Sequence, residues 1–495
     1  MKYLHFIALL LTIHGNAISQ NNSPEWTKDL IIYEISIKNF TSPNGFGSGT
    51  FNSTKQKVPY LNDLGVNAIW LSGHNWSNEK HFYGIWTQYA CIQPDSIDPS
   101  LGTRNEMKLL IDECHKYGIK VFLDIITHGV MNESPLIEQH PEWFKGGSWG
   151  MTDYDWQTHH KDLDDWWVKT HVDYALNQGV DGFRLDVAIY RLDLWQRIKN
   201  ECASKGKSIV VFPEHKCPAD NTVDFFQRFV TISNQTLGVD STVFLISNVG
   251  RYFSNLKPDK IQNTSISFPG TVFLSTQLSS HDDGWEGFPA NNNPFVAEGS
   301  RCLFGYSFLF VPGIPIFMSG EEFNAGFIGH PNLTSDLFGK HTNENAKWLY
   351  GAVLDWNQIK KPPHSSMLSD IKRMIQIRKT ENDIFHASII DSLPVVQELD
   401  YGADQQIPVP YALQNDEKII IVAGNPTNQK VECVLKLILN EFDLEITKEY
   451  VLYDLWNNKK RTIKGKDLEH FKFTILPDKM AKGGLSIFKI IKKKT

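Results

Sequence analysis

Short apolar runs alternate with helix-like stretches along the chain from residue 31 to about residue 380. Between the runs, apolar residues recur every three or four positions, which is the period of one helix face. Thr103-Arg104-Asn105-Glu106 is a capping box that predicts the start of one helix, and Gly179 predicts the end of another over Asp162–Gln178. The predicted strands are Ile31–Ile37, Asn67–Leu71, Lys120–Ile125, Gly182–Val187, Ser208–Phe212, Thr242–Ile246, a stretch before His281, and Ile314–Met318.

This alternation predicts the fold of the larger part of the chain. Repeated strand–helix units give a parallel sheet, and 495 residues suffice for a closed (β/α)8 TIM barrel with appendages. A long irregular stretch rich in Trp, Gly and His follows His128, and a loop of this length is usually functional. We therefore predict an α/β barrel over residues 20–383, with a short insert at about residues 129–161 after the third strand.

After about residue 384 the pattern changes to β segments separated by turn residues. No helix-period pattern interrupts them, which predicts a separate antiparallel β-sandwich over residues 384–495. The expected segments are Lys418–Val422, Val431–Leu435, Glu449–Leu452 and Leu485–Ile491.

The N-terminus has the pattern of a secretion signal. Lys2 precedes an apolar stretch from Leu4 to Ile13, and the small residues around Ala17 and Ser19 suit cleavage near residue 20. The apolar stretch is too short to span a bilayer, although a buried helix would read similarly. We expect residues 1–19 to be a signal peptide and the mature protein to be secreted or periplasmic, without a membrane segment.

Composition narrows the possible partners. The chain carries a net charge of −7, which argues against nucleic acid and anionic membranes as partners. Its 14 Trp, 16 Tyr and 30 Phe include rings that could stack on sugar faces, although most should be core residues. The six cysteines do not have the spacing of a metal site, and Cys114 in an amphipathic helix reads as a buried free thiol.

Acidic residues at the ends of predicted strands are the strongest indication of chemistry. Arg184 and Asp186 are two positions apart on one strand, so they share a face and the guanidinium can hold the carboxylate ionised. A second acid, Glu214, ends the next apolar run, and His281-Asp282 follows a later one. Glycoside hydrolysis needs one carboxylate that attacks and one carboxylic acid that protonates the leaving oxygen.

Six segments of the chain, in their order along the sequence, resemble the motifs of the α-amylase superfamily of glycoside hydrolases. The resemblance runs from about residue 26 to the C-terminus. The resemblance implies the barrel with a C-terminal sandwich and a retaining mechanism. The matching segments are Gly65–Leu71, Val121–Asp124 through His128, Asp181–Val187, Phe212–Glu214, His281-Asp282, and Gly313–Phe317 through Glu322.

The resemblance also implies a role for each site residue. Asp186 would be the nucleophile, Glu214 the general acid/base and Asp282 the stabiliser of the transition state. Four further residues would serve them: Arg184 would orient Asp186, with Asp124 as its structural partner, and His128 and His281 would donate hydrogen bonds to the sugar.

Two departures from the family pattern concern the aromatic platform and calcium. Relatives stack a Tyr beneath the reacting sugar, where this chain has Ile85, so Tyr83 or Trp86 would have to substitute. Relatives also hold calcium at an Asn replaced here by Thr127, or in an acidic loop that here, at Ser42–Thr50, has no carboxylate. Calcium prefers several charged oxygen ligands. We therefore expect no metal and no cofactor.

These features predict a hydrolase of α-glucosidic bonds in maltodextrin- or starch-like oligosaccharides and polysaccharides. A transglycosylase or isomerase of the same superfamily would use the same covalent intermediate with a sugar acceptor. A non-catalytic glucan-binding protein is a third possibility, but such relatives lose catalytic acids and this chain retains all three. Val187 after the nucleophile occurs in relatives of both linkage preferences, so α-1,4 and α-1,6 specificity both stay open.

Overall fold

The computed structural model describes residues 22–78, 86–148, 150–187, 190–214, 222–225, 230–231, 271–277, 281, 300–309, 313–325, 327–329, 352–389, 392, 394, 396–404 and 407–492. Several predictions lie outside these residues. They are the signal peptide, the strand Thr242–Ile246, and the site residues Tyr83, Ile85 and Asp282.

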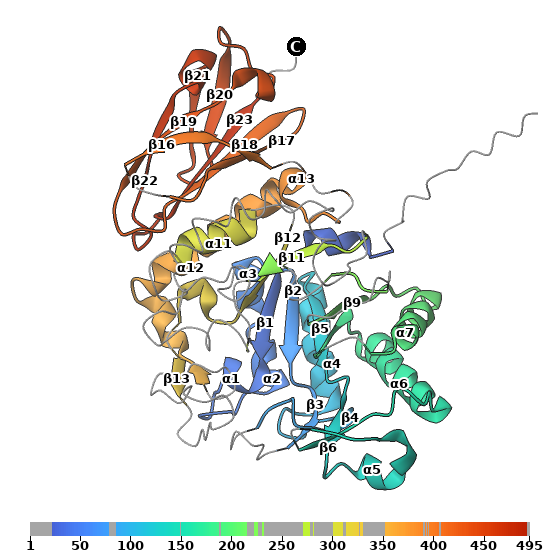
Figure 1. Ribbon diagram of the computed structural model, residues 1–495. Coiled ribbons are helices and arrows are strands. Elements are labelled where there is room, and N and C mark those ends of the chain that lie inside the picture. The colour runs from blue at the N-terminus through green and yellow to red at the C-terminus, as the bar shows by residue number, and fades with distance from the viewer. Residues whose placement is uncertain are drawn as a thin grey trace, which may run out of the picture.

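A parallel sheet forms the centre of the larger domain (Figure 1). In the described part of the chain it has eight strands in the order β10-β11-β12-β1-β2-β5-β8-β9, and all pairings are parallel. Strands predicted from the sequence overlap β1, β2, β5, β8, β9 and β12. The bounds are β1 (Ile32–Ser36), β2 (Ala68–Ser72), β5 (Lys120–Ile125), β8 (Gly182–Leu185), β9 (Val210–Pro213), β10 (Val230–Thr231), β11 (Leu274–Gln277) and β12 (Gly313–Met318).

Residues 222–225 join the two sides of this sheet into a barrel. The backbone N–H of Asp224 donates to the carbonyl of Val211 on β9 at 3.0 Å, and the N–H of Phe273 donates to the carbonyl of Asp224 at 2.9 Å. The Asp224 carboxylate accepts from the N–H of Val211 at 2.7 Å and pairs with Lys199 at 2.8 Å. Asp224 therefore links β9 to the segment that leads into β11.

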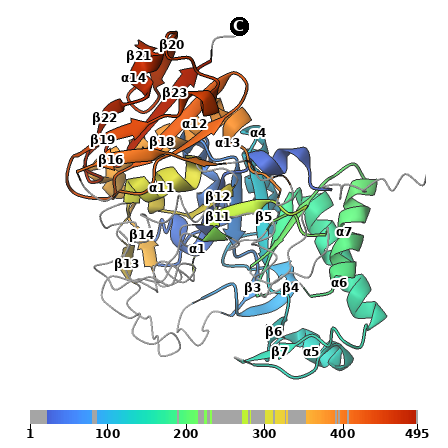
Figure 2. The same ribbon diagram turned by 45° about the horizontal axis from the view of Figure 1, so that its top comes forward.

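Helices cover the outside of the sheet (Figures 1 and 2). The predicted capping box is present, since the Thr103 hydroxyl accepts from the N–H of Glu106 and the Glu106 carboxylate from the N–H of Thr103. The second predicted helix also ends at Gly179, with its last turn widened to a π-helix, η3 (Tyr174–Gln178). The main helices are α3 (Val58–Leu64), α4 (Arg104–Lys116), α6 (Lys161–Asp173), α7 (Leu192–Ser204), α11 (Ser300–Leu309), α12 (His364–Thr380) and α13 (Asn382–Phe385).

Strand alternation separates the barrel interior from the layer beneath the helices. On β1, Ile32 belongs to the inner apolar cluster and Tyr33 to the outer one, so Glu34 points inward. The same parity turns Asp124 and Arg184 inward. Gly182 lies close against the paired strand β9: a Cβ there would lie 2.3 Å from the carbonyl oxygen of Val210, so this position requires glycine. The inner cluster comprises Leu30, Ile32, Ala68, Trp70, Phe122, Val210, Phe212, Phe225, Phe273, Ile314, Ile316 and Ala387.

A small insert follows β5 at the carboxyl end of the barrel. Its strands β6 (Gly129–Met131) and β7 (Met151–Asp153) pair antiparallel and enclose helix α5 (Pro135–Gln139). Figure 1 shows it at the bottom of the view, opposite the C-terminal domain at the top. The insert predicted after the third strand is therefore present. A second ribbon at this end pairs β3 (Asn75–Ser77) with β4 (Cys91–Ile97).

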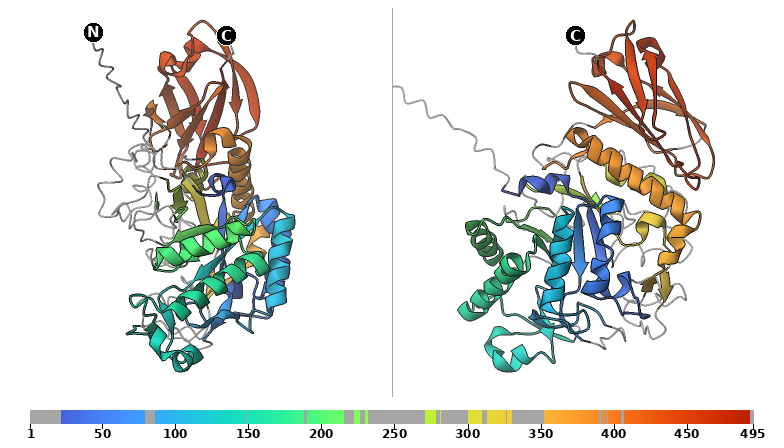
Figure 3. Two further views of the ribbon diagram at one scale, coloured as in Figure 1. Left: turned by 90° about the vertical axis from the view of Figure 1, so that its right-hand side faces the viewer. Right: turned by 180° about the vertical axis from the view of Figure 1, so that it is seen from behind.

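The C-terminal domain is an antiparallel sandwich with its own apolar core (Figure 3). In the described residues one sheet has the order β15-β17-β18-β23-β20-β21 and the other β16-β19-β22. The predicted fold class is thus confirmed. The bounds are β15 (Gln397–Glu398), β16 (Asp400–Ala403), β17 (Tyr411–Gln414), β18 (Lys418–Gly424), β19 (Val431–Lys436), β20 (Glu449–Asp454), β21 (Lys459–Lys464), β22 (Phe471–Ile475) and β23 (Leu485–Ile491).

Buried polar contacts fasten the sandwich to helices α11 and α12. The Arg301 guanidinium on α11 pairs with Asp370 on α12 at 2.7 Å and donates to the backbone carbonyl of Asp478 at 2.9 Å. The Asp478 carboxylate accepts in return from the N–H of Cys302 at 2.8 Å. The Tyr411 hydroxyl on β17 donates to the carbonyl of Leu309 at 3.0 Å.

Two further sequence expectations concern cysteines and membranes. Cys91, Cys114, Cys202, Cys302 and Cys433 are all buried free thiols, which confirms the prediction for Cys114. In the part of the chain that the structure describes, none of the helices has the length and apolar character needed to span a bilayer.

Candidate active site

Arg184 on β8 is the centre of the candidate active site. Its fully buried guanidinium lies 2.9 Å from Asp124, 2.7 Å from Asp186 and 3.1 Å from Glu214. Burial alone would lower its pKa, but the carboxylates around it, Asp124 foremost, hold that pKa well above the ordinary value. Arg184 is therefore a permanent cation that brings the predicted nucleophile and the predicted acid together, with Asp124 as its partner.

The contacts of Asp186 fix both its carboxylate and its backbone. Oδ1 accepts from Arg184, and Oδ2 lies 3.8 Å from Nε2 of His128. Its N–H donates to the carbonyl of Ile125 at 2.9 Å, and its own carbonyl accepts from the Thr127 hydroxyl at 2.9 Å. Thr127, at the position where the resemblance leads one to expect Asn, thus anchors the strand end that carries the predicted nucleophile.

Glu214 follows β9 and is also held at its carboxyl group. Oε2 accepts a hydrogen bond from the backbone N–H of Val187 at 2.8 Å and is the oxygen that lies nearest Arg184. Val187 has a φ of 62°, a left-handed conformation that is rare for a β-branched residue. Both contacts hold Oε2 of Glu214 in a fixed position at the end of β9.

His281 joins this centre through residues that the sequence did not single out. Nδ1 of His281 lies 2.5 Å from Oε1 of Glu34, and Nε2 lies 2.8 Å from the hydroxyl of Tyr89. The Tyr89 hydroxyl donates to Oδ2 of Asp124 at 2.8 Å, which also accepts from Trp70 at 3.1 Å. One network therefore runs from Glu34 to Arg184.

A sequence signal for Glu34 did exist. It is a charged residue inside the apolar run that predicts the first strand, with the parity of the inward-facing Ile32. A buried carboxylate in such a run needs a partner. Tyr89 gave no such signal, because it lies among many aromatic residues.

His128 connects the centre to the insert. Its Nδ1 lies 3.7 Å from Asp153 on β7, and its Nε2 faces Asp186. Burial lowers the pKa of His128, and Asp153 opposes this shift without reversing it. The neutral imidazole can donate one hydrogen bond, so its predicted role as a donor to the sugar remains chemically possible.

Trp86 contacts residues that are not members of the Arg184 network. Its indole N–H donates to Asp98 at 2.8 Å, its ring packs over Gly73, and Lys38 lies 5.2 Å from the ring centre. Its role as a platform for the sugar stays a prediction, as do the roles of Tyr83 and Asp282.

One group of side chains in and beside the insert could supply ligands to a metal ion. Among the described residues, His140, Glu142 and Asp162 in and beside the insert bring ligand atoms within 4.8 Å of one another. Glu142 and Asp162 are exposed, and Asp162 already accepts from the indole of Trp143 at 2.8 Å. Among the described residues, none of these three side chains has a hydrogen bond or ion pair with a residue of the Arg184 network.

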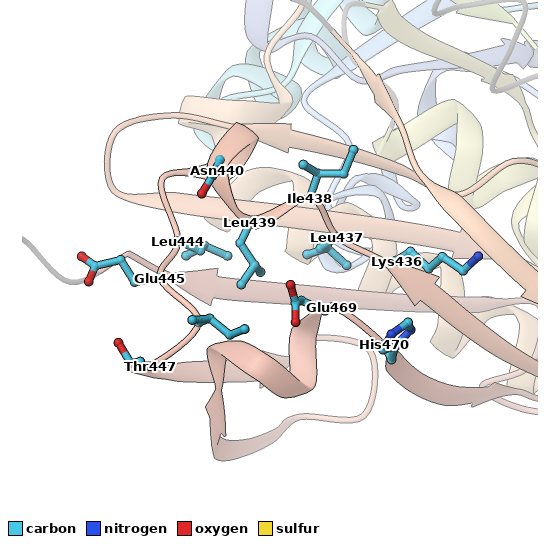
Figure 4. Close-up of a pocket in the computed structure, with 11 residues that line it drawn as sticks. Lys436, Leu437, Ile438, Leu439, Asn440, Leu444, Glu445, Thr447, Glu469 and His470 are labelled. Atoms are coloured by element: carbon cyan, nitrogen blue, oxygen red, sulfur yellow. The ribbon is translucent and has the colours of Figure 1, made fainter.

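The sandwich has a pocket of its own (Figure 4). It measures about 750 Å³ and is bordered by the apolar side chains Leu437, Leu439 and Leu444 and by polar Glu469 and His470. All its lining residues lie between 436 and 470, so it is separate from the strand-end acids of the barrel.

The fold and site define a class: a (β/α)8 barrel with a buried arginine that holds carboxylates at its strand ends. The family model of the α-amylase catalytic domain matches residues 34–145. Over these residues the chain is similar to the catalytic domain of the α-amylase family.

Individual relatives vary in how much of the chain they match. An α-glucosidase of Culex pipiens is 35% identical over 140 residues, or 28% of this chain and 22% of that protein. The chain thus spans about a fifth of that relative's length. A cyclomaltodextrinase of Thermoanaerobacter pseudethanolicus is 23% identical over 85% of this chain and 73% of its own length. The structure of a maltogenic α-amylase from Thermotoga neapolitana superposes with a TM-score of 0.65 at 17% identity, covering 94% of this chain and 99% of the other.

Proposed function

We propose that this protein is a retaining α-glucan hydrolase that cleaves α-glucosidic bonds in maltodextrin- or starch-type substrates. The observation that carries the proposal is the contact of one buried cation, Arg184, with both Asp186 and Glu214. Asp186 comes from β8 and Glu214 from β9, so both acids stand at the same end of the barrel, where TIM-barrel enzymes have their active sites.

The chemistry follows from the two acids. Asp186, kept ionised by Arg184, attacks the anomeric carbon while Glu214 gives its proton to the leaving oxygen. A covalent glycosyl–enzyme intermediate results, and Glu214 then takes a proton from the attacking water as the sugar is released. Asp282 would hold sugar hydroxyls and stabilise the oxocarbenium-like transition state.

Product analysis tests this proposal. Purified protein is incubated with maltoheptaose, isomaltose, pullulan and cyclodextrin, and products are followed by chromatography and by NMR of the anomeric proton. Release of α-anomeric products supports the proposal, whereas initial β-anomers show inversion and no release from any substrate contradicts hydrolysis. Larger oligosaccharides formed from maltose, or isomerised maltose, would instead identify the transglycosylase or isomerase alternative.

We also propose that residues 1–19 direct export to the periplasm or the medium. Support comes from the charged, apolar and small-residue regions of the N-terminus. N-terminal sequencing of the protein from the native host's exported fraction should find a mature end near Gln20. A product that stays in the cytoplasm with its N-terminal stretch intact would contradict this.

A further inference from the structure

Tyr190 is an exposed aromatic residue beside the strand end that carries Asp186. It follows Asp186 by four positions, on the segment that leads from β8 to helix α7. Tyr190 is 37% exposed, whereas Asp186 is only 8% exposed. Single exposed aromatic residues are ordinary on protein surfaces, so exposure by itself says nothing about function. The place of Tyr190 beside the candidate active site is what distinguishes it.

The backbone on both sides of Tyr190 has an unusual conformation. Val187 has a φ of 62° and Arg191 a φ of 52°, which are left-handed values that residues other than glycine rarely adopt. Backbone of this kind is concentrated at active sites and ligand clamps, because only strong local contacts maintain it. Both terminal nitrogens of Arg191 donate to the carboxylate of Asp164 on helix α6 at 2.6 Å. This pair fixes the residue directly after Tyr190 to the barrel, so the position of Tyr190 is set before any ligand binds.

Two carboxylates place the Tyr190 hydroxyl near the predicted nucleophile and the insert. Burial raises the pKa of Tyr190, and the charges of Asp153 and then Asp186 raise it further. Such interactions are largely screened beyond about 10 Å, so the hydroxyl lies near both acids. His128 lies between the same acids, with Nδ1 3.7 Å from Asp153 and Nε2 3.8 Å from Asp186. Tyr190 therefore stands where β7 of the insert faces the end of β8.

The depth of Asp186 and Tyr190 indicates which part of a substrate each would contact. A nucleophile must reach the anomeric carbon, so the reacting sugar would lie over the nearly buried Asp186. Tyr190 is nearer the solvent, where a neighbouring sugar of an oligosaccharide would lie. A tyrosine ring offers an apolar face and a polar tip, which suits a sugar with C–H groups on one face and hydroxyls at its edge. Among the described residues the Tyr190 hydroxyl has no hydrogen-bond partner, so ring and hydroxyl are both available to a ligand.

We propose that Tyr190 is a substrate-binding residue whose ring packs against the glucose unit that adjoins the one attacked by Asp186. This proposal rests on the proposed function and adds to it a preference for oligosaccharides over substrates with a single glucose unit. In the described part of the chain, the hydrogen-bond partners of Asp186 and Glu214 are other residues, so Tyr190 acts on binding and not on the reacting groups.

The first test is the variant Y190A, which removes the ring. Two substrates are compared: maltoheptaose, which occupies several sugar positions, and α-glucosyl fluoride, which fills only the position at Asp186. The kcat/KM for maltoheptaose should fall at least about tenfold, because the contact with the second sugar is lost. The kcat/KM for α-glucosyl fluoride should change by less than about twofold. No change on either substrate overturns the proposal, and so does an equal loss on both, which would mean that Asp186 is displaced.

Two control variants separate the ring contact from general damage. Tyr117 is 40% exposed, much like Tyr190, but it ends helix α4 just before β5 begins at Lys120, at the opposite end of the barrel. Y117A should therefore leave kcat/KM unchanged on both substrates. Y190F keeps the ring and should retain most of the wild-type kcat/KM for maltoheptaose. If Y117A loses as much as Y190A, or if Y190F loses as much as Y190A, the proposed ring contact is wrong.

The second test does not depend on catalysis. Maltoheptaose is titrated into D186N and into the double variant D186N/Y190A, and Kd is measured by isothermal titration calorimetry. We expect Kd to rise at least about tenfold when the ring is removed. An equal Kd in the two proteins overturns the role of Tyr190 and leaves the proposed function intact. If D186N does not bind maltoheptaose and the wild type does not cleave it, the proposed function itself fails, and the role of Tyr190 with it.

Discussion

The backbone N–H of Val187 donates a hydrogen bond to Oε2 of Glu214 at 2.8 Å. Val187 directly follows Asp186, so the backbone that positions the predicted nucleophile also holds the predicted acid. Val187 has a left-handed φ of 62° at this bond, and a conformation of this kind costs on the order of 1–3 kcal/mol. Such strain persists only where the surrounding structure enforces it. Here the surrounding structure consists of the ends of strands β8 and β9.

The spacing of Asp186 and Glu214 gives the first prediction. A retaining mechanism requires about 5–5.5 Å between the two carboxyl groups, and inversion requires roughly 6.5–9.5 Å. A crystal structure with a bound oligosaccharide should show the shorter spacing, and D186N should abolish turnover without unfolding the protein. Near-wild-type activity of folded D186N would place the nucleophile elsewhere.

Glu214→Gln should discriminate between leaving groups. The amide cannot protonate a sugar oxygen, so activity on maltodextrin should fall by about 10²–10⁴-fold. Activated aryl glycosides leave without a proton and should retain most of the rate of the intermediate-forming step. Steady-state kinetics on both substrates measure the difference, and an equal loss on both would argue against an acid role.

Thr127→Val should impair catalysis through the backbone of Asp186. The change removes the hydroxyl that donates to the Asp186 carbonyl at 2.9 Å but keeps the side-chain shape. The lost bond should lower the free energy of unfolding by about 0.5–1.5 kcal/mol. A displaced nucleophile should lower kcat/KM by about 10- to 100-fold. T127S retains the hydroxyl and should stay near wild type; equal losses in T127S and T127V would show that the methyl group matters instead.

These residues show what the sequence could and could not predict. The strand ends and the Arg184–Asp186 pair follow from alternation and apolar runs, which are local. The hydrogen bond from Thr127 to Asp186 and the contact of Glu34 with His281 join residues 59 and 247 positions apart. Pairings over such separations depend on how the barrel closes, and a single sequence gives no information on them. Val187 illustrates the same limit, because its residue type gives no sign of a positive φ.

His74 should make the fold sensitive to acid. Burial, and then the charges of His171 and Arg104, lower its pKa to about 3, and neither ring nitrogen has a hydrogen-bond partner among the described residues. Because this folded-state pKa lies below the unfolded value of about 6.5, the unfolded state takes up the proton first as pH falls. The stabilising contribution is complete above pH 6.5 and should have fallen by about 2 kcal/mol at pH 5.

The variant H74L tests this pH dependence. Urea unfolding should show that the stability of H74L relative to wild type rises by about 2 kcal/mol between pH 7.5 and pH 5. H470L, at an exposed histidine of the sandwich, is the control variant. A pH-independent difference for H74L would mean that the buried imidazole does not titrate as described.

Removal of calcium is expected to change nothing. The loop Ser42–Thr50 has no carboxylate, and Thr127 uses its hydroxyl on the Asp186 backbone. A chelator should therefore leave both activity and melting temperature unchanged, as measured by thermal scanning with and without EDTA. If melting temperature falls and is restored by added calcium, variants of Asp153, Asp155 and Asp162 would identify the ligands.

The buried contacts of Arg301 have a consequence for how the protein unfolds. Arg301 and Asp370 pair with each other on two barrel helices, and Arg301 also donates to the backbone carbonyl of Asp478 in the sandwich; all three residues are buried. Separating the sandwich from the barrel would break this bond and the bond from the Cys302 N–H to the Asp478 carboxylate, and each buried group left unpaired would cost about 1–3 kcal/mol. The two domains therefore gain or lose their structure together, and the protein should behave in calorimetry as a single cooperative unit.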